Sequence, residues 1–201
     1  MNILICGDSF AADWTVKYSG QGWPNMIAND YNVTNLAQAG CSEYKIYKQL
    51  TSIDLNQFDK IIISHTSPYR IPIKIHPVHA KDLLHKNSDL IYTDIKEHSK
   101  TNTNLSSIID FFENYFDIES SLFVHNLICE KIDKITKSIP TIHLTNSDWN
   151  GLYLFDNMLN FEYLFKSNRG LINHYDEKGN QIIYRAIKNM VDREGFEPPT
   201  K

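Results

Sequence analysis

Short apolar runs alternate along the chain with stretches of helical periodicity. The runs at residues 2–6 (NILIC), 31–37 (YNVTNLA), 58–64 (FDKIIIS) and 140–145 (PTIHLT) each have the length of a β-strand. Three consecutive isoleucines in the third run predict a strand buried on both faces, as in parallel sheets. The pattern therefore predicts a sheet that begins with the first residues of the chain.

Helical spacing separates these runs. Helices are predicted at residues 23–31, with Pro24 in the first turn, at residues 42–50, with Ser42 as cap, and at residues 177–191. Two more apolar stripes, within residues 105–116 and 124–135, predict one or two long helices that cover the core. Strands that alternate with helices predict an α/β fold, a three-layer α/β/α sandwich with a mainly parallel sheet of about five strands.

Two segments lack such a pattern. Residues 72–103 are polar and rich in histidine, which predicts a loop or a broken helical excursion, and we expect this insert to flank the active site. Residues 193–201 (REGFEPPTK) contain two prolines and predict a disordered tail without a function. The length of 201 residues, 42% of them hydrophobic, predicts one domain over residues 1–192.

Charge and composition exclude several classes of partner. A net charge of −4 leaves no general basic surface for phosphates, so nucleic acid is not expected as a partner. Because the chain has neither a long apolar span nor a signal-peptide pattern, we expect a cytoplasmic protein without membrane contact. The three cysteines form no C-x-x-C pair, so buried, reduced thiols are expected. The sequence leaves the oligomeric state open.

The carboxyl ends of the predicted strands carry chemically suggestive residues. In an open α/β sheet, ligands bind at this edge. Gly7-Asp8-Ser9 follows the first strand and predicts a strand-to-helix turn, where a serine hydroxyl lies near free backbone N–H groups. The alternative is an ordinary connection in which Asp8 or Ser9 caps the next helix.

Four blocks of the sequence resemble the SGNH, or GDSL-type, hydrolases. They are ILICGDSF at the start, NLAQAG, the polar segment after the isoleucine-rich strand, and NHYDEKGN before the last helix. The resemblance implies a flavodoxin-like fold, Ser9 as nucleophile and oxyanion donor, Gly40 as a second oxyanion donor, and His174 as general base.

Two positions depart from the family pattern. The third block, usually G-x-N-D, is Ser64-His65-Thr66-Ser67 here, so Thr66 stands where the asparagine would complete the oxyanion hole. Losing one oxyanion donor typically costs about 10²–10³ in rate, and His65 could substitute or only line the pocket. In the last block, D-x-x-H becomes LINH, which removes the orienting carboxylate. A backbone carbonyl is the first candidate to hold His174, ahead of Asp148 and Asp176.

Other residues have competing interpretations. Arg70 could hold an anionic substrate group, although a structural salt bridge is favoured. His76, His79 and His85 lack a matching carboxylate or cysteine at helical spacing and Pro77 disturbs any helix, so no metal and no cofactor are predicted. An aromatic-rich stretch could form a ligand platform, although core packing is favoured; its members are Trp149, Tyr153, Phe155, Phe161, Tyr163 and Phe165.

Three functions compete at this point. The first is a serine hydrolase acting on carboxylic esters, an esterase or deacetylase with a small-molecule or saccharide ester as substrate, or an acyltransferase. The second is a catalytically impaired relative that binds carbohydrate or another small molecule. The third, a phosphate or nucleotide binder, ranks last because the first turn lacks a glycine-rich phosphate motif.

Overall fold

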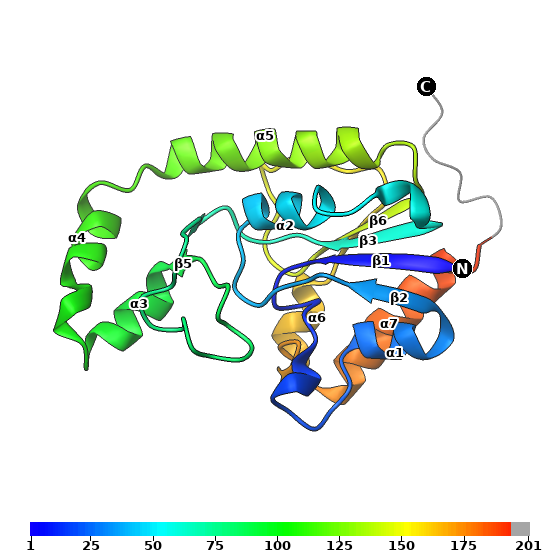
Figure 1. The fold of residues 1–201 in the computed structure, drawn as a ribbon, viewed down its shortest axis with the longest axis horizontal. Coiled ribbons are helices and arrows are strands. Elements are labelled where there is room, and N and C mark those ends of the chain that lie inside the picture. Colours follow the sequence, from blue (N-terminus) through cyan, green and yellow to red (C-terminus); the bar gives the residue numbers. More distant parts are fainter. Residues whose placement is uncertain (194–201) are drawn as a thin grey trace.

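The computed structural model describes residues 1–193, in which five parallel strands lie between two layers of helices (Figure 1). The strand order is β2-β1-β3-β6-β7, the 2-1-3-4-5 order of flavodoxin-like sheets. The predicted three-layer α/β/α sandwich is confirmed. The strands are β1 Asn2–Gly7, β2 Asn32–Asn35, β3 Lys60–Ser64, β6 Thr141–Thr145 and β7 Met158–Asn160.

The topological switch point of this sheet lies between β1 and β3. Their register pairs Ile3 with Lys60 and Gly7 with Ser64, so both strands end at the same level. Loops that leave such a switch point on opposite sides open a crevice at the carboxyl edge of the sheet. Ser9 follows one of these two strands directly, which places it at that edge.

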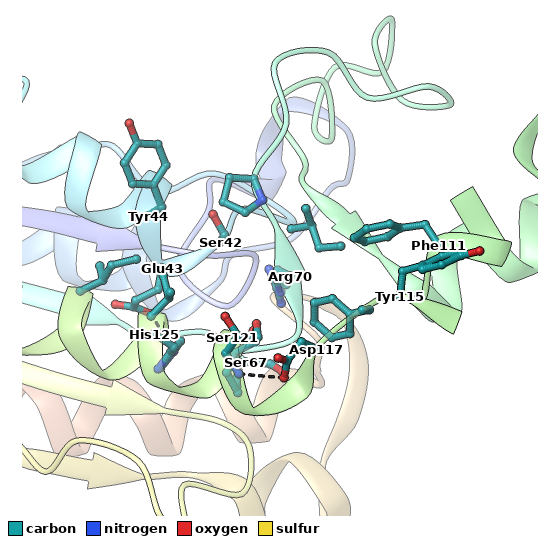
Figure 2. A pocket seen from close by; sticks show the side chains of 17 residues that line it. Ser42, Glu43, Tyr44, Ser67, Arg70, Phe111, Tyr115, Asp117, Ser121 and His125 are labelled. Atoms are coloured by element: carbon teal, nitrogen blue, oxygen red, sulfur yellow. Dashed lines mark hydrogen bonds and ion pairs between the residues drawn. The ribbon is translucent and has the colours of Figure 1, made fainter. Parts of the chain in front are cut away.

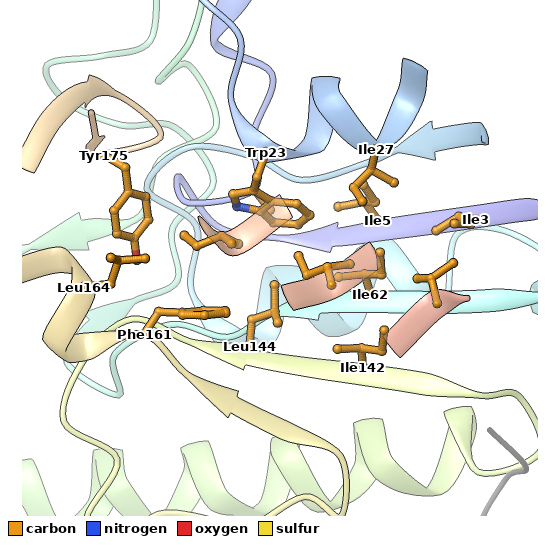
Figure 3. Packing of buried hydrophobic residues seen from close by; sticks show 14 residues of the cluster. Ile3, Ile5, Trp23, Ile27, Ile62, Ile142, Leu144, Phe161, Leu164 and Tyr175 are labelled. Carbon is orange, nitrogen blue, oxygen red and sulfur yellow. The ribbon is translucent and has the colours of Figure 1, made fainter. Parts of the chain in front are cut away.

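Two apolar clusters fill the space between the layers. Ile3 and Ile5 face one side of the sheet with α1 and α7 (Figure 3), whereas Leu4 and Cys6 face the other side with α2 and α5. This alternation follows from the two-residue period of a strand that is buried on both faces. The helices are α1 Trp23–Asp30, α2 Glu43–Leu50, α5 Ile118–Thr136 and α7 Glu177–Val191.

Of the two apolar stripes that predicted one or two core-covering helices, only the second forms a helix that covers the sheet. Helix α5 packs over the sheet, but Val124 and Leu127 are about half exposed rather than buried. Helix α4, Ser106–Asn114, lies beside α3, Tyr92–Ser99, away from the central sheet (Figure 1), and shares a separate apolar cluster with it. An amphipathic stripe specifies an apolar face, but it does not specify which surface covers that face.

Several short elements have no counterpart in the predicted pattern. The polar segment 72–103 consists of turns that are followed by β5 and α3, and by the 3-10 helix η3 at its end. Strand β7 and the beginning of helix α6 lie in the C-terminal half of the aromatic-rich stretch. The remaining elements are β4 Arg70–Ile71, β5 Leu90–Ile91, η1 Trp14–Val16, η2 Leu55–Gln57, η3 Thr103–Leu105, α6 Glu162–Ser167 and β8 Arg169–Ile172.

Three further predictions concern thiols, membranes and the tail. All three cysteines are free and buried, as predicted. No helix within residues 1–193 is both long and apolar enough to cross a bilayer. The predicted disordered tail, apart from Arg193, lies outside the described residues.

Candidate functional site

Ser9 lies in a tight turn at the end of β1. The backbone N–H groups of Ala11 and Ala12 both donate to the carbonyl oxygen of Asp8, at 3.1 and 3.0 Å, which closes one helical turn around Ser9. The predicted helix does not follow, because the chain continues into η1 and α1 begins only at Trp23. Stabilisation of an oxyanion at Ser9 would therefore depend on individual N–H groups rather than on the dipole of a helix that follows the turn.

His174 meets Ser9 from the far end of the sequence. Its Nε2 lies 2.8 Å from Ser9 Oγ although 165 positions separate the two residues. The ring projects from a turn between β8 and α7 in which Asn173 and His174 have φ angles of 51° and 64°. Such left-handed backbone is uncommon outside glycine and often marks a position that function constrains.

Aromatic contacts hold the His174 ring. Its centroid lies 4.6 Å from that of Phe10 and 5.1 Å from that of Trp14, whose indole N–H also donates to the Ser9 carbonyl oxygen at 2.8 Å. Within residues 1–193, Nδ1 of His174 takes part in no hydrogen bond, so neither the predicted carbonyl nor a carboxylate orients it.

The two aspartates considered as replacement acids are engaged elsewhere. Asp176 caps α7 by accepting from the Gly179 N–H at 2.7 Å, and Asp148 accepts from the Asn150 N–H at 3.0 Å. Burial, followed by the positive charge of Arg70, lowers the pKa of His174 to about 4. The imidazole is therefore neutral at pH 7, and with its proton on Nδ1 the ring can accept the Ser9 hydroxyl proton at Nε2.

A cavity of about 180 Å³ opens beside this pair. Ser9 and Gly40 both line it, and within residues 1–193 neither of their backbone N–H groups donates a hydrogen bond. Unpaired backbone N–H groups beside a reacting serine are the kind of donor from which an oxyanion hole is built. The other lining residues are Arg70, His79, His85, Ser88, Asp89, Ile91, Asp94 and His174.

The structure places Thr66 and His65 outside the cavity that Ser9 lines. Thr66 is buried, its backbone N–H donates to Glu43 Oε2 at 3.2 Å, and it is not among the residues that line this cavity. His65 does not line it either, since its Nδ1 lies 2.7 Å from Glu43 Oε1 and its Nε2 lies 2.9 Å from His143 Nδ1. Both positions thus belong to a buried polar network under α2 and α5, which adjacency in the sequence could not reveal.

Arg70 connects the turn of Ser9 with the backbone at Cys41. Its guanidinium donates to Asp8 Oδ2 at 3.1 Å and to the Cys41 carbonyl oxygen at 2.8 Å. Arg70 thus has the structural salt bridge that the sequence analysis favoured, and it also lines the Ser9 cavity. Burial raises the pKa of Asp8, which makes the nearby guanidinium important for keeping this carboxylate ionised.

A second, larger cavity of about 380 Å³ is also lined by Arg70 (Figure 2). Figure 2 shows Phe111 and Tyr115 of the α4 region facing Tyr44 and Glu43 of the α2 region across it. Most of its wall is apolar. Ser9 and His174 do not line this cavity.

Two clusters contain residue types that bind metal ions. In the first, His79 Nε2 lies 3.1 Å from both carboxylate oxygens of Asp94, and His76 Nε2 lies 3.7 Å from one of them. However, His76 Nδ1 accepts the N–H groups of Val78 and His79, so the neutral ring, whose pKa burial lowers to about 4, carries its proton on Nε2. A protonated nitrogen has no lone pair for a metal.

The second cluster contains Glu43, His125 and Cys129. Its carboxylate is already paired with His65, and His125 Nε2 lies 3.0 Å from the Thr66 carbonyl oxygen. Burial also raises the pKa of Cys129 far above its usual value, which keeps the thiol protonated. Neither cluster thus presents a complete set of free ligand atoms.

Sequence reasoning missed several residues around the site. Asn173 ties the His174 turn to the Ser9 turn, and Phe10 and Trp14 pack on the His174 ring. In the aromatic-rich stretch, Trp149, Phe155 and Phe161 are buried in the core, as favoured from the sequence, while Tyr163 is exposed. The turn residues of segment 72–103 gave no periodic signal.

Neither a comparison with protein-family models nor one with curated protein sequences finds a match for this chain.

Proposed function

We propose that the chain is a serine hydrolase of the SGNH type that acts on carboxylic esters. The distance of 2.8 Å between Ser9 Oγ and His174 Nε2 carries this proposal. A neutral imidazole at that distance can take the hydroxyl proton while Oγ attacks an ester carbonyl carbon. The alcohol then leaves, Ser9 carries the acyl group, and water releases the acid.

The free N–H groups of Ser9 and Gly40 support the second requirement, stabilisation of the oxyanion. Thr66 does not line the cavity, so this hole contains two backbone donors rather than the three of the family pattern. Arg70 adds a positive charge at the same wall. We therefore expect an enzyme that is slower than hydrolases with a third donor, by about 10²–10³-fold.

The cavity volume favours a small acyl group. Pockets for drug-sized ligands usually measure about 300–1,000 Å³, whereas the Ser9 cavity measures about 180 Å³. An acetyl group fits such a space, and the alcohol of an acetylated saccharide can extend from its mouth. Deacetylation of a small-molecule or saccharide ester is thus the reaction that the site supports best.

A second candidate is a protein that binds a small molecule or carbohydrate without catalysis. Two observations favour it: within residues 1–193 no acid orients His174, and the larger cavity is not the one that Ser9 lines. This protein would keep the fold and a pocket but would not form an acyl-enzyme.

Covalent labelling with a fluorophosphonate probe separates the two candidates. We expect the folded wild-type protein to be labelled, and Ser9→Ala and His174→Ala to lose the label. Ser107→Ala, an exposed serine on α4, is the matched control and should be labelled like the wild type. Folded wild-type protein that takes up no label would reject the hydrolase in favour of the binding protein.

A further inference from the structure

The larger cavity, at about 380 Å³, has the size of a small-molecule site. Pockets for drug-sized ligands usually measure about 300–1,000 Å³. Neither Ser9 nor His174 lines this cavity. A ligand bound there would therefore be a second function of the chain, separate from the reaction proposed for Ser9.

Aromatic side chains from two separate elements line the larger cavity. Tyr44 belongs to α2, whereas Phe111 belongs to α4 and Tyr115 directly follows that helix. Figure 2 shows Tyr44 on one side of the cavity and Phe111 and Tyr115 on the other. The three side chains are 45%, 42% and 71% exposed, so much of their ring surface is open to a ligand. A flat aromatic molecule between them would bury this surface and gain ring contacts.

One buried hydroxyl of the cavity lining has no partner. Ser42, the residue before α2, is 4% exposed, and within residues 1–193 its Oγ takes part in no hydrogen bond. It does not cap α2, because the Lys45 N–H donates to the Ser42 carbonyl oxygen instead. A buried polar group without a partner is unfavourable, and a ligand can supply that partner. Rotation about the single torsion χ1 moves the hydroxyl among three staggered positions and can turn it to a ligand.

Two backbone N–H groups lie at the same end of the cavity. Within residues 1–193 the N–H groups of Glu43 and Tyr44 donate no hydrogen bond, as is usual in the first turn of a helix. Ser42, Glu43 and Tyr44 all line the cavity. Three donors at one end favour a ligand that presents an acceptor oxygen there.

The charges around the cavity oppose an anionic ligand. Glu43 and Asp117, two acidic residues, line it, and the positive charge of Arg70 is already balanced by Asp8 at 3.1 Å. A carboxylate of the ligand would be repelled by these acids. The acceptor oxygen that fits this site is therefore an uncharged one, such as the oxygen of a carbonyl group.

The remaining polar groups of the lining mostly have partners within the protein. Ser121 Oγ donates to the Pro68 carbonyl oxygen at 2.6 Å, and Asp117 Oδ1 accepts from the Ser120 N–H at 3.0 Å. A saccharide carries many hydroxyl groups and would find few free partners here. A ligand with one polar group matches the cavity better.

We propose that the larger cavity binds an uncharged aromatic compound with one carbonyl group. The carbonyl oxygen accepts from the Ser42 hydroxyl and the free N–H groups of α2, and the aromatic body lies between Tyr44 and the side chains of Phe111 and Tyr115. The inference goes beyond the proposed hydrolase and does not require it, since Ser9 and His174 take no part in this site.

Equilibrium dialysis of three matched naphthalenes tests the chemistry of the site. The probe 2-acetylnaphthalene carries the carbonyl group, 2-ethylnaphthalene has a similar shape without the oxygen, and 2-naphthoate carries a negative charge. We expect one 2-acetylnaphthalene to bind per chain, about tenfold more tightly than 2-ethylnaphthalene, the effect of one hydrogen bond to an otherwise unpaired group. The ketone should also bind more tightly than 2-naphthoate.

Ser42→Ala tests the polar end of the site. This variant should bind 2-acetylnaphthalene about tenfold more weakly than the wild type and should bind 2-ethylnaphthalene equally well. It should fold normally, because the hydroxyl that it loses has no bond within residues 1–193. Ser107→Ala removes an exposed serine of α4 that does not line the cavity, and it should bind both probes like the wild type.

Tyr115→Ala tests the aromatic end. Because this side chain is 71% exposed, the variant should fold, and it should bind the ketone and the hydrocarbon more weakly by a similar factor. Phe123→Ala is the matched control, since Phe123 is an aromatic residue of α5 that is 65% exposed and does not line the cavity. Its affinity for both probes should equal that of the wild type.

Several results would overturn this site. They are the absence of binding, equal affinities of the wild type for ketone and hydrocarbon, a preference for the ketone that persists in Ser42→Ala, and tighter binding of 2-naphthoate. Ser9→Ala should bind 2-acetylnaphthalene like the wild type, because Ser9 does not line the cavity. A failure of the proposed hydrolase would therefore leave these affinities unchanged.

Discussion

The side-chain amide of Asn173 donates a hydrogen bond of 2.7 Å to the carbonyl oxygen of Ala12. This bond joins the turn that carries His174 to the turn that carries Ser9, across 161 positions of sequence. Gly22 leaves the space for it, since a Cβ there would lie 1.6 Å from Asn173 Oδ1.

Replacing Asn173 should therefore lower both the free energy of unfolding and the rate of fluorophosphonate labelling. Asn173→Ala removes a buried hydrogen bond and leaves the Ala12 carbonyl oxygen unpaired, at a cost of about 1–3 kcal/mol, and it also strains a backbone with φ of 51°. Asn173→Gly removes the bond but tolerates that φ, so it should lose less stability. Urea unfolding measures the loss of stability in each variant. Equal losses in Asn173→Ala and Asn173→Gly would show that the left-handed backbone at this position adds no strain to the alanine variant.

The pH dependence of labelling should reveal the lowered pKa of His174. The reaction needs the neutral ring, and burial lowers the pKa to about 4, so the labelling rate constant should stay level from pH 8 to about 5. Below pH 4 it should fall about tenfold per pH unit. A fall centred near pH 6.5, the ordinary value for histidine, would show that the ring is exposed to solvent.

The same shift has a consequence for stability. Between the ordinary pKa of 6.5 and about 4, the unfolded chain binds a proton at His174 that the folded protein does not. The free energy of unfolding should therefore decrease as the pH falls through this range. His174→Gln, which has no titrating ring at this position, should show a weaker decrease in urea titrations.

A substitution at Gly40 tests whether its backbone N–H is the second donor of the proposed oxyanion hole. Its φ is 74°, and an added Cβ would lie 2.4 Å from Ser88 Oγ on the wall of the cavity. Gly40→Ala should displace the local backbone and reduce labelling by about 10²–10³-fold, the effect of losing one donor. Gly151→Ala is the matched control, because Gly151 has φ of 73° with nothing within 4 Å of the added Cβ.

This control shares the backbone strain of about 1–2 kcal/mol but not the steric overlap. Its labelling should equal that of the wild type. If Gly40→Ala is labelled as fast as Gly151→Ala, Gly40 does not contribute to the oxyanion hole.

Removing only one member of the Arg70–Asp8 ion pair should lower the free energy of unfolding. The two side chains are 12% and 1% exposed and lie 3.1 Å apart, so Arg70→Leu leaves a buried carboxylate without its charge partner. We expect a loss of about 3–5 kcal/mol in the free energy of unfolding. The double variant Arg70→Leu/Asp8→Asn should recover part of it, and additive single effects in a double-mutant cycle would contradict the coupling.

The sequence was sufficient for four of the five strands of the sheet and for Ser9 and His174, the two residues whose side chains the structure brings together. Runs such as NILIC and FDKIIIS predict strands because a strand that is buried on both faces needs consecutive apolar residues. Strands β1 and β3 lie at the positions that these runs predict. The GDS turn and the last histidine were recognisable because their blocks adjoin strong elements. The short strand β7 and helix α6 were missed because their few residues show no periodic pattern.

Only the tertiary structure decided which polar residues meet. Thr66 and His65 follow a sheet strand directly, yet they turn into the buried network of Glu43, whereas His85, from a segment without periodicity, reaches the cavity of Ser9. Local sequence determines whether a residue lies in a strand, a helix or a turn, because backbone preferences and apolar spacing act over a few positions. The partners of a side chain depend on how distant segments pack, and here that packing determined that Phe10 and Trp14 hold His174 where the SGNH pattern has an aspartate.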